Sequence, residues 1–169
     1  LPLLAQHFKE PARESNQGRT PSLLVGFNRR FSPMIRSIKD FMTDVQEPLA
    51  IRCRVNAGFL SSDHWTNDPE IGGGRVIGEL CHFVDTLTYL AGARPSRVFA
   101  RSLGDSGKYS GDNVIAILDF DNGAVGEITY LSNGDRTIGK EHIEVFGGER
   151  SAILDDFKQV TLTRDGRSK

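Results

Sequence analysis

Apolar residues recur at helical spacing in two parts of the chain. In the segment 32–45 they form one face of a helix, with Met34, Ile35, Ile38, Phe41, Met42 and Val45. Ser32 stands before them as a candidate N-cap, and Pro33 fits the first helical position because no partner is needed there for the N–H that it lacks. The second segment runs from the glycines at 72–74 into a helix whose core face carries Leu80, Val84, Leu87 and Ala91.

Alternating apolar and polar residues predict strands elsewhere. In 49–59, Ile51, Cys53 and Val55 point to one side, and the arginines between them point to the other. Other strand candidates are 22–27, 96–103, 112–132, 141–147, 151–156 and 158–164. The triplet Asp121-Asn122-Gly123 turns the 112–132 segment into a hairpin, because Asn-Gly adopts positive φ easily.

The last third of the chain is nearly all strand, and its connections are too short for parallel crossovers. We therefore expect an α+β fold: an open, mostly antiparallel β-sheet of about six strands, with two or three helices packed on one face.

The polar side of the second helix groups three side chains around a glycine. With Gly78 as the origin, His82, Asp85 and Tyr89 lie within about 40° of it around the helix. One interpretation is a surface ion pair between His82 and Asp85. The other is that this face borders a cleft, where a carboxylate raises the basicity of His82 for proton transfer. Gly78 favours the second, because a glycine inside a helix costs about 1 kcal/mol and usually has a packing or access reason.

The glycines before this helix do not match a nucleotide-binding loop. Gly72 and Gly74 supply two places of Gly-x-Gly-x-x-Gly, but Ile77 stands at the third, and no Gly-Lys-Ser/Thr follows. A simple turn is the favoured interpretation. A metal site is not expected either, because the acidic residues and histidines here lack the familiar ligand spacings.

Two polar loops contain further candidates. The first follows a strand candidate and contains Asn28, Arg29 and Arg30. One interpretation is that the adjacent arginines bind a carboxylate, a phosphate or sugar hydroxyls. The other is that they are ordinary solvated loop residues. His64 and Trp65 lie in "SSDHWTNDP", a composition typical of a sugar-contacting lid, although a buried anchor tryptophan is equally consistent with it.

Composition narrows the class of protein. The 169 residues carry a net charge of −1 without a basic stripe, which argues against a nucleic-acid partner. We find neither an apolar run of membrane-spanning length nor a secretory signal pattern, and the two cysteines make a disulfide framework improbable. These observations predict a cytoplasmic protein with no membrane partner.

Three segments, "VGFNRRFSP", "GGGRVIGELCHFVDTLTYLAG" and "KEHIEVFGGERSAILDDF", occur in this order. They closely resemble the C-terminal domain of the glucose–fructose oxidoreductase/inositol dehydrogenase (Gfo/Idh/MocA) family, over about residues 22–160. Members of that family are NAD(P)-dependent, and pair an N-terminal Rossmann domain with an α+β domain whose open sheet often forms the dimer interface. Neither the glycine fingerprint nor the Glu-Lys-Pro motif of the Rossmann half occurs here. The resemblance implies that 1–21 are the tail of the crossover from a missing Rossmann domain and that 22–169 are the substrate-binding and dimerisation domain.

The resemblance also implies roles for single residues. His82 matches the family histidine that contacts the reacting hydroxyl and assists proton transfer. The family commonly has an aspartate one turn earlier; here that position is Gly78, and the adjacent Glu79 is a candidate replacement. Asp85 matches an acidic position that either orients the histidine or is structural.

Other matched positions concern substrate binding. Asn28 and Arg29 correspond to the segment that borders the nicotinamide and the substrate, and Lys140 opens a strand near the substrate. With His64 and Trp65 of the candidate lid, they complete the expected substrate-binding set, beside the catalytic candidates His82, Glu79 and Asp85.

The expected function follows from the resemblance. The chain is interpreted as the substrate and dimerisation domain of an NAD(P)-dependent oxidoreductase that acts on a sugar, cyclitol or nucleotide-sugar hydroxyl. It would be inactive without the Rossmann half, which would bind the NAD or NADP, and a homo-oligomer through the sheet is expected. The alternative is a non-catalytic sugar-binding or oligomerisation module, for which Gly78 is the best argument.

Overall fold

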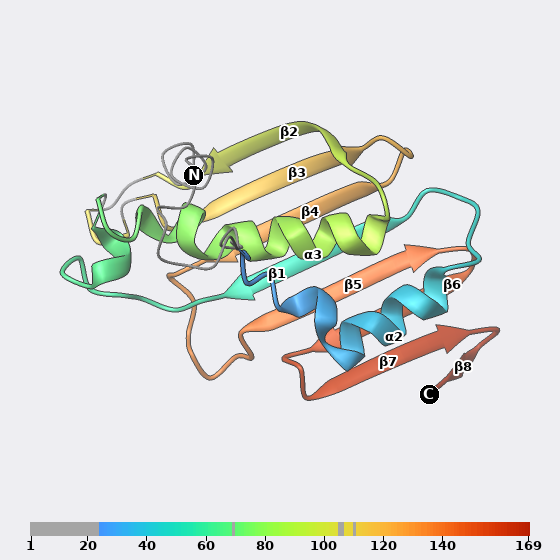
Figure 1. Cartoon of the computed structure of the whole chain (residues 1–169). Helices are drawn as coiled ribbons and strands as arrows, with labels where there is room; N and C mark the ends of the chain where they lie inside the picture. Colours follow the sequence, from blue (N-terminus) through green and yellow to red (C-terminus); the bar gives the residue numbers. More distant parts are fainter. Residues whose placement is uncertain (1–23, 69, 105–106, 110) are drawn as a thin grey trace, which may run out of the picture.

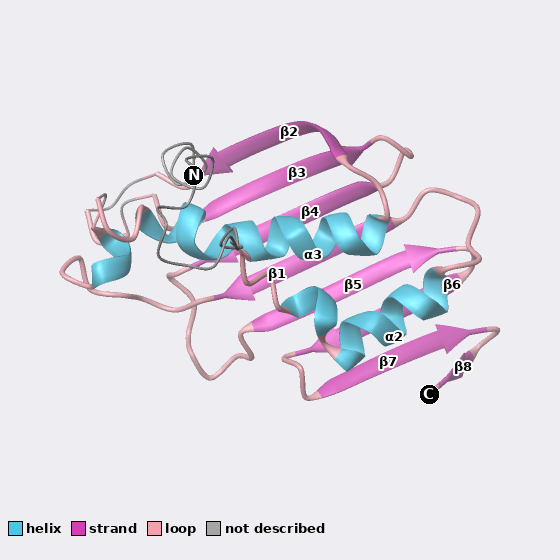
Figure 2. Ribbon diagram, in the orientation of Figure 1, coloured by secondary structure: helices cyan, strands magenta, loops and turns pink. Residues whose placement is uncertain are grey.

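Eight strands form one open sheet that carries helices on one face in the computed structural model, which describes residues 24–68, 70–104, 107–109 and 111–169 (Figures 1 and 2). The strands are β1 (Ala50–Asn56), β2 (Pro95–Ser102), β3 (Val114–Phe120), β4 (Val125–Leu131), β5 (Glu141–Gly147), β6 (Arg150–Asp155), β7 (Gln159–Arg164) and β8 (Arg167–Ser168). Their order across the sheet is β2-β3-β4-β1-β5-β6-β7-β8.

The expected α+β architecture is confirmed, with differences in the sheet. It has eight strands rather than about six, and the central β1 runs parallel to β4, whereas the other neighbouring pairs are antiparallel. The chain can make this parallel pair because α3, β2 and β3 lie between the two strands in sequence, which is length enough for a crossover. The strand expected at 22–27 is not found at residues 24–27, and its first two residues lie outside the described part.

Two helices cover the same face of the sheet (Figure 2). Helix α2 (Pro33–Met42) begins with Pro33 after Ser32, as expected, although the Ser32 side chain makes no capping hydrogen bond. Helix α3 (Cys81–Ala91) is preceded by a π-helical turn, η3 (Val76–Leu80), and Gly92 ends it in the left-handed conformation with φ 72°. Two short 3₁₀ turns, η1 (Arg29–Phe31) and η2 (Trp65–Asn67), lie in the loops before α2 and α3.

The core lies between these helices and the sheet. Leu80 at the end of η3 and Leu87 and Ala91 of α3 are buried as predicted, whereas Val84 is half-buried. The inward residues of β1 are buried as well, in register with Ile128 of β4 and Ile143 of β5 on either side of Cys53. This packing fixes α3 across the centre of the sheet, with its N-terminal end over the edge where β1 ends and β5 begins (Figure 1).

Candidate functional site

A glycine turn leads the chain into η3 and α3. An added Cβ at Gly72 would lie 2.4 Å from the carbonyl oxygen of Thr66 and 2.5 Å from that of Trp65, so only a glycine lets the two segments approach this closely. Gly73 and Gly74 have φ values of 69° and 83°, which also favour glycine. The turn therefore packs the loop at 61–68 against the start of the helix.

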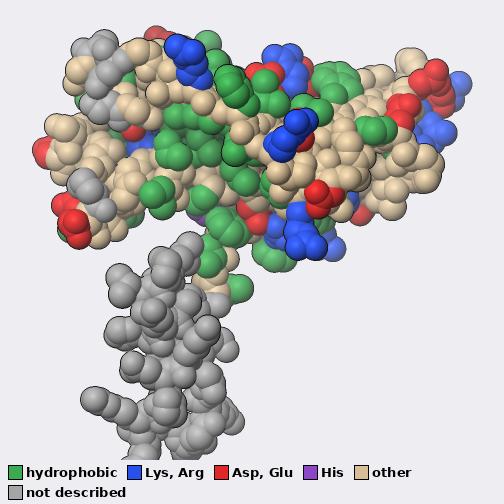
Figure 3. All heavy atoms as spheres, turned by 90° about the horizontal axis from the view of Figure 1, so that it is seen from above, with side chains coloured by type: hydrophobic (Ala, Val, Ile, Leu, Met, Phe, Trp, Pro, Cys, Tyr) green, Lys and Arg blue, Asp and Glu red, His purple; other side chains and the backbone are tan. Residues whose placement is uncertain are grey.

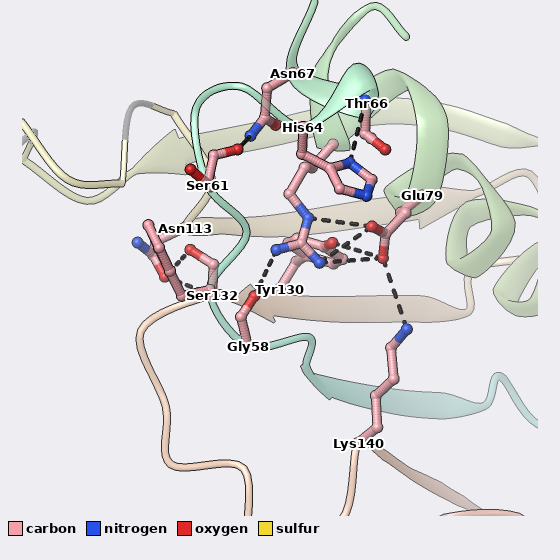
Figure 4. A network of polar contacts seen from close by, with 12 residues as sticks. Gly58, Ser61, His64, Thr66, Asn67, Glu79, Asn113, Tyr130, Ser132 and Lys140 are labelled. Atoms are coloured by element: carbon pink, nitrogen blue, oxygen red, sulfur yellow. Dashed lines mark hydrogen bonds and ion pairs between the residues drawn. The ribbon is translucent and has the colours of Figure 1, made fainter.

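Glu79, in η3, is the centre of a polar network (Figure 4). Its carboxylate accepts hydrogen bonds from Arg75 Nε at 3.1 Å and Nη2 at 3.3 Å, and from the Tyr130 hydroxyl at 2.9 Å. Lys140 Nζ lies 3.7 Å from the carboxylate. These contacts fix the Glu79 carboxylate in one place while leaving its side chain 26% exposed.

Arg75 and Tyr130 are the deeply buried members of the network. The Arg75 side chain is 2% exposed, and its Nη1 donates to the carbonyl oxygen of Gly58 at 2.5 Å. Burial, followed by the neighbouring Glu79 carboxylate, raises the pKa of the Tyr130 phenol. Tyr130 therefore remains a hydrogen-bond donor to Glu79 over the ordinary pH range.

His82 lies one turn further along, at the start of α3. Its ring is half-buried and packs edge-on against Phe27, with 5.5 Å between the ring centroids. Its Nδ1 is covered and has no hydrogen-bond partner in the part of the chain that the structure describes. Burial and, after it, the positive charge of Arg29 lower the pKa of His82. Asp85 and other nearby carboxylates raise this pKa, as expected, but burial and Arg29 outweigh them, so the net basicity of His82 is lowered rather than raised.

Asp85 is engaged by Arg30, not by His82. Arg30 Nε donates to one carboxylate oxygen at 2.8 Å, and Nη2 donates to the other. No ion pair joins Asp85 to His82 within the described ranges, so the interpretation of these two residues as a surface pair is wrong.

Arg29 makes a second bidentate pair. Its Nε and Nη2 donate to Glu141 at 2.8 and 2.7 Å, and its guanidinium lies 4.3 Å from the centre of the Phe83 ring. The Arg29 side chain is only 18% exposed, so the interpretation of the arginines as solvated loop residues is wrong. The two arginines connect η1 to β5 and α3.

A shallow pocket of about 320 Å³ adjoins this pair and is lined by Asn28, Arg29, Ser32, Glu141 and Phe157. Asn28 is exposed at its rim. Of the predicted substrate-binding residues, Asn28 and Arg29 thus lie together, and Lys140 stands apart from them beside Glu79.

His64 and Trp65 lie on the loop that packs against the glycine turn. Trp65 is 63% exposed, so a buried anchor is excluded. Its ring centroid lies 5.8 Å from that of His64, whose Nδ1 accepts a hydrogen bond from the Thr66 amide at 3.3 Å. An exposed tryptophan beside a histidine held in place can contact a ligand. The lid formed by these two residues stays a prediction.

Sequence reasoning missed three residues that build the site: Arg75, Tyr130 and Glu141. For Arg75 a signal existed, because Arg75 and Glu79 have the i,i+4 spacing of a helical ion pair. For Tyr130 on β4 and Glu141 on β5 no such signal exists, because their partners, Glu79 and Arg29, are distant in sequence. Among the described residues, no three His, Cys, Asp or Glu side chains come together as a metal site, and no helix is long and apolar enough to span a membrane.

Comparison with known proteins identifies a family and a relative of this chain. The sequence model described as the GFO/IDH/MocA C-terminal domain matches residues 44–153. The uncharacterized oxidoreductase YrbE of Bacillus subtilis (strain 168) is 27% identical over 165 residues, covering 83% of this chain and 42% of YrbE.

Solved structures share the fold. Levoglucosan dehydrogenase, in complex with NADH and levoglucosan, has a TM-score of 0.69 at 20% identity, over 86% of this chain and 46% of that one. UDP-N-acetylglucosamine 3-dehydrogenase GnnA from Acidithiobacillus ferrooxidans has a TM-score of 0.67 at 19% identity, over 87% and 45%. The chain thus spans less than half the length of these relatives. Because the domain model matches well over half of its residues, the chain belongs to the GFO/IDH/MocA C-terminal domain family.

Proposed function

We propose that the chain is the substrate-binding and dimerisation domain of an NAD(P)-dependent oxidoreductase that acts on a hydroxyl of a sugar, cyclitol or nucleotide sugar. In this proposal, residues 1–21 lead from a Rossmann domain outside this chain, and activity needs both domains. The similarity to an oxidoreductase and to dehydrogenases of levoglucosan and a nucleotide sugar supports the proposal.

The observation that carries this proposal is the state of His82. A histidine whose pKa is lowered is neutral at neutral pH, so it can accept a proton from a substrate hydroxyl. Since Nδ1 is covered, Nε2 is the nitrogen that takes this proton. A nicotinamide, when bound by the parent protein, accepts the hydride from the substrate carbon.

The neighbours of His82 have distinct proposed roles. Glu79 stands beside the position of the family aspartate and accepts a hydrogen bond from a second substrate hydroxyl, held for this by Arg75 and Tyr130. Asp85 acts through Arg30, and is therefore a positioning residue. Lys140 contacts the substrate next to Glu79.

Substrate binding completes the proposal. Asn28 and Arg29 line the pocket of about 320 Å³ at the rim of the site. His64 and Trp65 form a lid, in which the indole stacks on a sugar face.

The test uses the full-length parent with NAD or NADP and a panel of polyols, sugars and nucleotide sugars. His82→Ala should lower kcat by roughly 10²–10⁴-fold, the usual contribution of a general base. His142→Gln is the matched control, because His142 lies on the opposite side of the sheet and should leave kcat unchanged. Unchanged turnover in His82→Ala would remove this residue from the mechanism.

Gly78 is the observation that favours a second candidate, a non-catalytic sugar-binding or oligomerisation module. An aspartate side chain is absent at this position, although a Cβ there would make only ordinary contacts, at 3.5 and 3.7 Å. Failure of the parent to reduce either cofactor with any substrate, while a sugar still binds, would favour this module.

A further inference from the structure

A second pocket, of about 410 Å³, is lined in part by Lys140, whose ammonium group lies 3.7 Å from Glu79. It is formed where β1 ends, by the loop before β5 and by the turn between β6 and β7. Arg136, Lys140 and Lys158 contribute three positive charges to its lining, and Asp156 contributes the one negative charge. The pocket therefore has a formal charge of +2.

The negative charge is already engaged within the protein. Asp156 accepts hydrogen bonds from the amides of Lys140 at 2.7 Å and Glu141 at 3.2 Å, and from Lys158 Nζ at 2.8 Å. Its carboxylate thus closes the turn against the start of β5 and has little capacity to neutralise the other cations.

The positive charges are less fully compensated. Arg136 makes no ion pair in the described part of the chain, and its Nη2 donates to the carbonyl oxygen of Phe59. The carboxylate nearest Lys140 is Glu79, which is already held by Arg75 at shorter distances. The side chains of Lys140 and Lys158 are 46% and 78% exposed, so both ammonium groups can reach a ligand.

We propose that this pocket binds a phosphoryl group of the substrate. A phosphate ester carries about −1.5 to −2 charges near pH 7, which matches the net charge of the lining. An arginine fork together with lysine point charges suits phosphate oxygens, whereas a single carboxylate would leave most of these donors unused. The volume lies within the range of small-molecule sites.

The inference rests on the proposed function and narrows its substrate class. The ammonium of Lys140 is 3.7 Å from Glu79, so one lysine side chain connects the phosphoryl pocket to the carboxylate that is proposed to hold a second substrate hydroxyl. A sugar phosphate or a nucleotide sugar has an anionic group and a sugar ring next to each other, and fits both places. A neutral sugar or cyclitol fills only one of them.

The experiment is a calorimetric titration of the chain at low salt, without cofactor. The probes are glucose, glucuronate, glucose 1-phosphate, UDP-glucose and inorganic pyrophosphate. The phosphorylated probes should bind roughly tenfold more tightly than glucose or glucuronate, and Arg136→Gln or Lys158→Gln should each remove roughly tenfold of this affinity. Arg97→Gln, in an 83% exposed side chain on β2, is the matched control and should change nothing.

The outcomes separate the possible ligands. Tighter binding of UDP-glucose than of glucose 1-phosphate assigns the pocket to the diphosphate of a nucleotide sugar, and equal binding assigns it to a phosphate monoester. Glucuronate binding as tightly as glucose 1-phosphate overturns the proposal, and so does phosphoryl binding that neither variant weakens.

The same data distinguish this inference from the proposed function, because no turnover is measured. If the parent enzyme oxidises neutral sugars and the chain binds none of the phosphorylated probes, only the inference about this pocket is overturned. Phosphoryl binding by the chain, with no oxidation by the parent, contradicts the oxidoreductase proposal alone.

Discussion

At the scale of single residues, His82 combines partial burial with a positively charged neighbour. Both effects oppose its protonation in the folded protein, whereas in the unfolded chain it titrates near its ordinary pKa of 6.5. The unfolded state therefore takes up more protons as the pH falls through 6.5. By linkage, this residue lowers the free energy of unfolding below that pH and has no such effect above it.

His82→Gln should remove this part of the acid dependence. We expect the free energy of unfolding of the variant to fall less than that of the wild type between pH 7.5 and 5.5. Urea denaturation at both pH values measures the difference. An equally steep loss in the two proteins would contradict the burial of His82 described above.

The Glu79 network gives a second prediction at this scale. Glu79→Ala leaves Arg75, a 2% exposed side chain, without its two carboxylate bonds, and should lower the free energy of unfolding by about 2–3 kcal/mol. Tyr130→Phe removes a single hydrogen bond and should lower it by about 1 kcal/mol. Urea denaturation at pH 7.5 compares them, and the reverse order would mean that Glu79 does not compensate Arg75.

At the scale of elements, the glycine turn and η3 position the polar end of α3. The two glycines of interest differ in what surrounds them. Gly72 abuts backbone atoms at 2.4–2.5 Å, whereas a Cβ at Gly78 would meet its nearest neighbours at 3.5 and 3.7 Å, which is ordinary contact. The same substitution should therefore have opposite effects at these positions.

Gly72→Ala should lower the free energy of unfolding by about 2 kcal/mol, since backbone cannot move aside as a flexible side chain does. Gly78→Ala should raise it by about 0.5–1 kcal/mol, because alanine loses less backbone entropy in a helix. Thermal or urea unfolding measures both. Destabilisation by Gly78→Ala would show that Gly78 is needed for the conformation of η3.

At the scale of the whole molecule, the helices leave the opposite face of the sheet uncovered. Alternation along the strands places Phe99, Ile117 and Phe146 on that face, where they are 69%, 43% and 37% exposed. Strand β2 forms one edge and is exposed along its whole length. Figure 3 looks onto the molecule from above Figure 1, where β2 is the uppermost strand, and shows hydrophobic side chains gathered along the middle of that view. We propose that a second copy of the chain covers this face, since apolar surface of this kind commonly marks an interface.

Ile117→Glu should shift the protein from dimer to monomer, because it places a charge in the middle of the proposed interface. Ile77→Glu is the matched control, since Ile77 is 70% exposed but lies on η3, on the helical side. Analytical ultracentrifugation at several concentrations measures the effect. A monomeric wild type, or a dimer that Ile117→Glu leaves intact, would contradict the proposed interface.

What the sequence determined by itself is local. Hydrophobic periodicity located α2, α3 and most strands, because burial of one face of an element places apolar residues at a regular spacing along the chain. The Asn-Gly turn located the β3–β4 hairpin. The same repeat placed His82 and Asp85 on the side of α3 away from Leu80 and Leu87.

Only the tertiary structure decided which of these groups meet. Arg29 pairs with Glu141 across 112 positions of sequence, Arg30 with Asp85 across 55, and Tyr130 with Glu79 across 51. The parallel pairing of β1 with β4 likewise depends on the path of the intervening chain. Periodicity indicates which face of an element is buried. A contact between elements that are distant in sequence depends on how those elements pack in three dimensions. That placement gave His82 a lowered pKa, engaged Asp85 with Arg30 and gathered the three cations around one pocket.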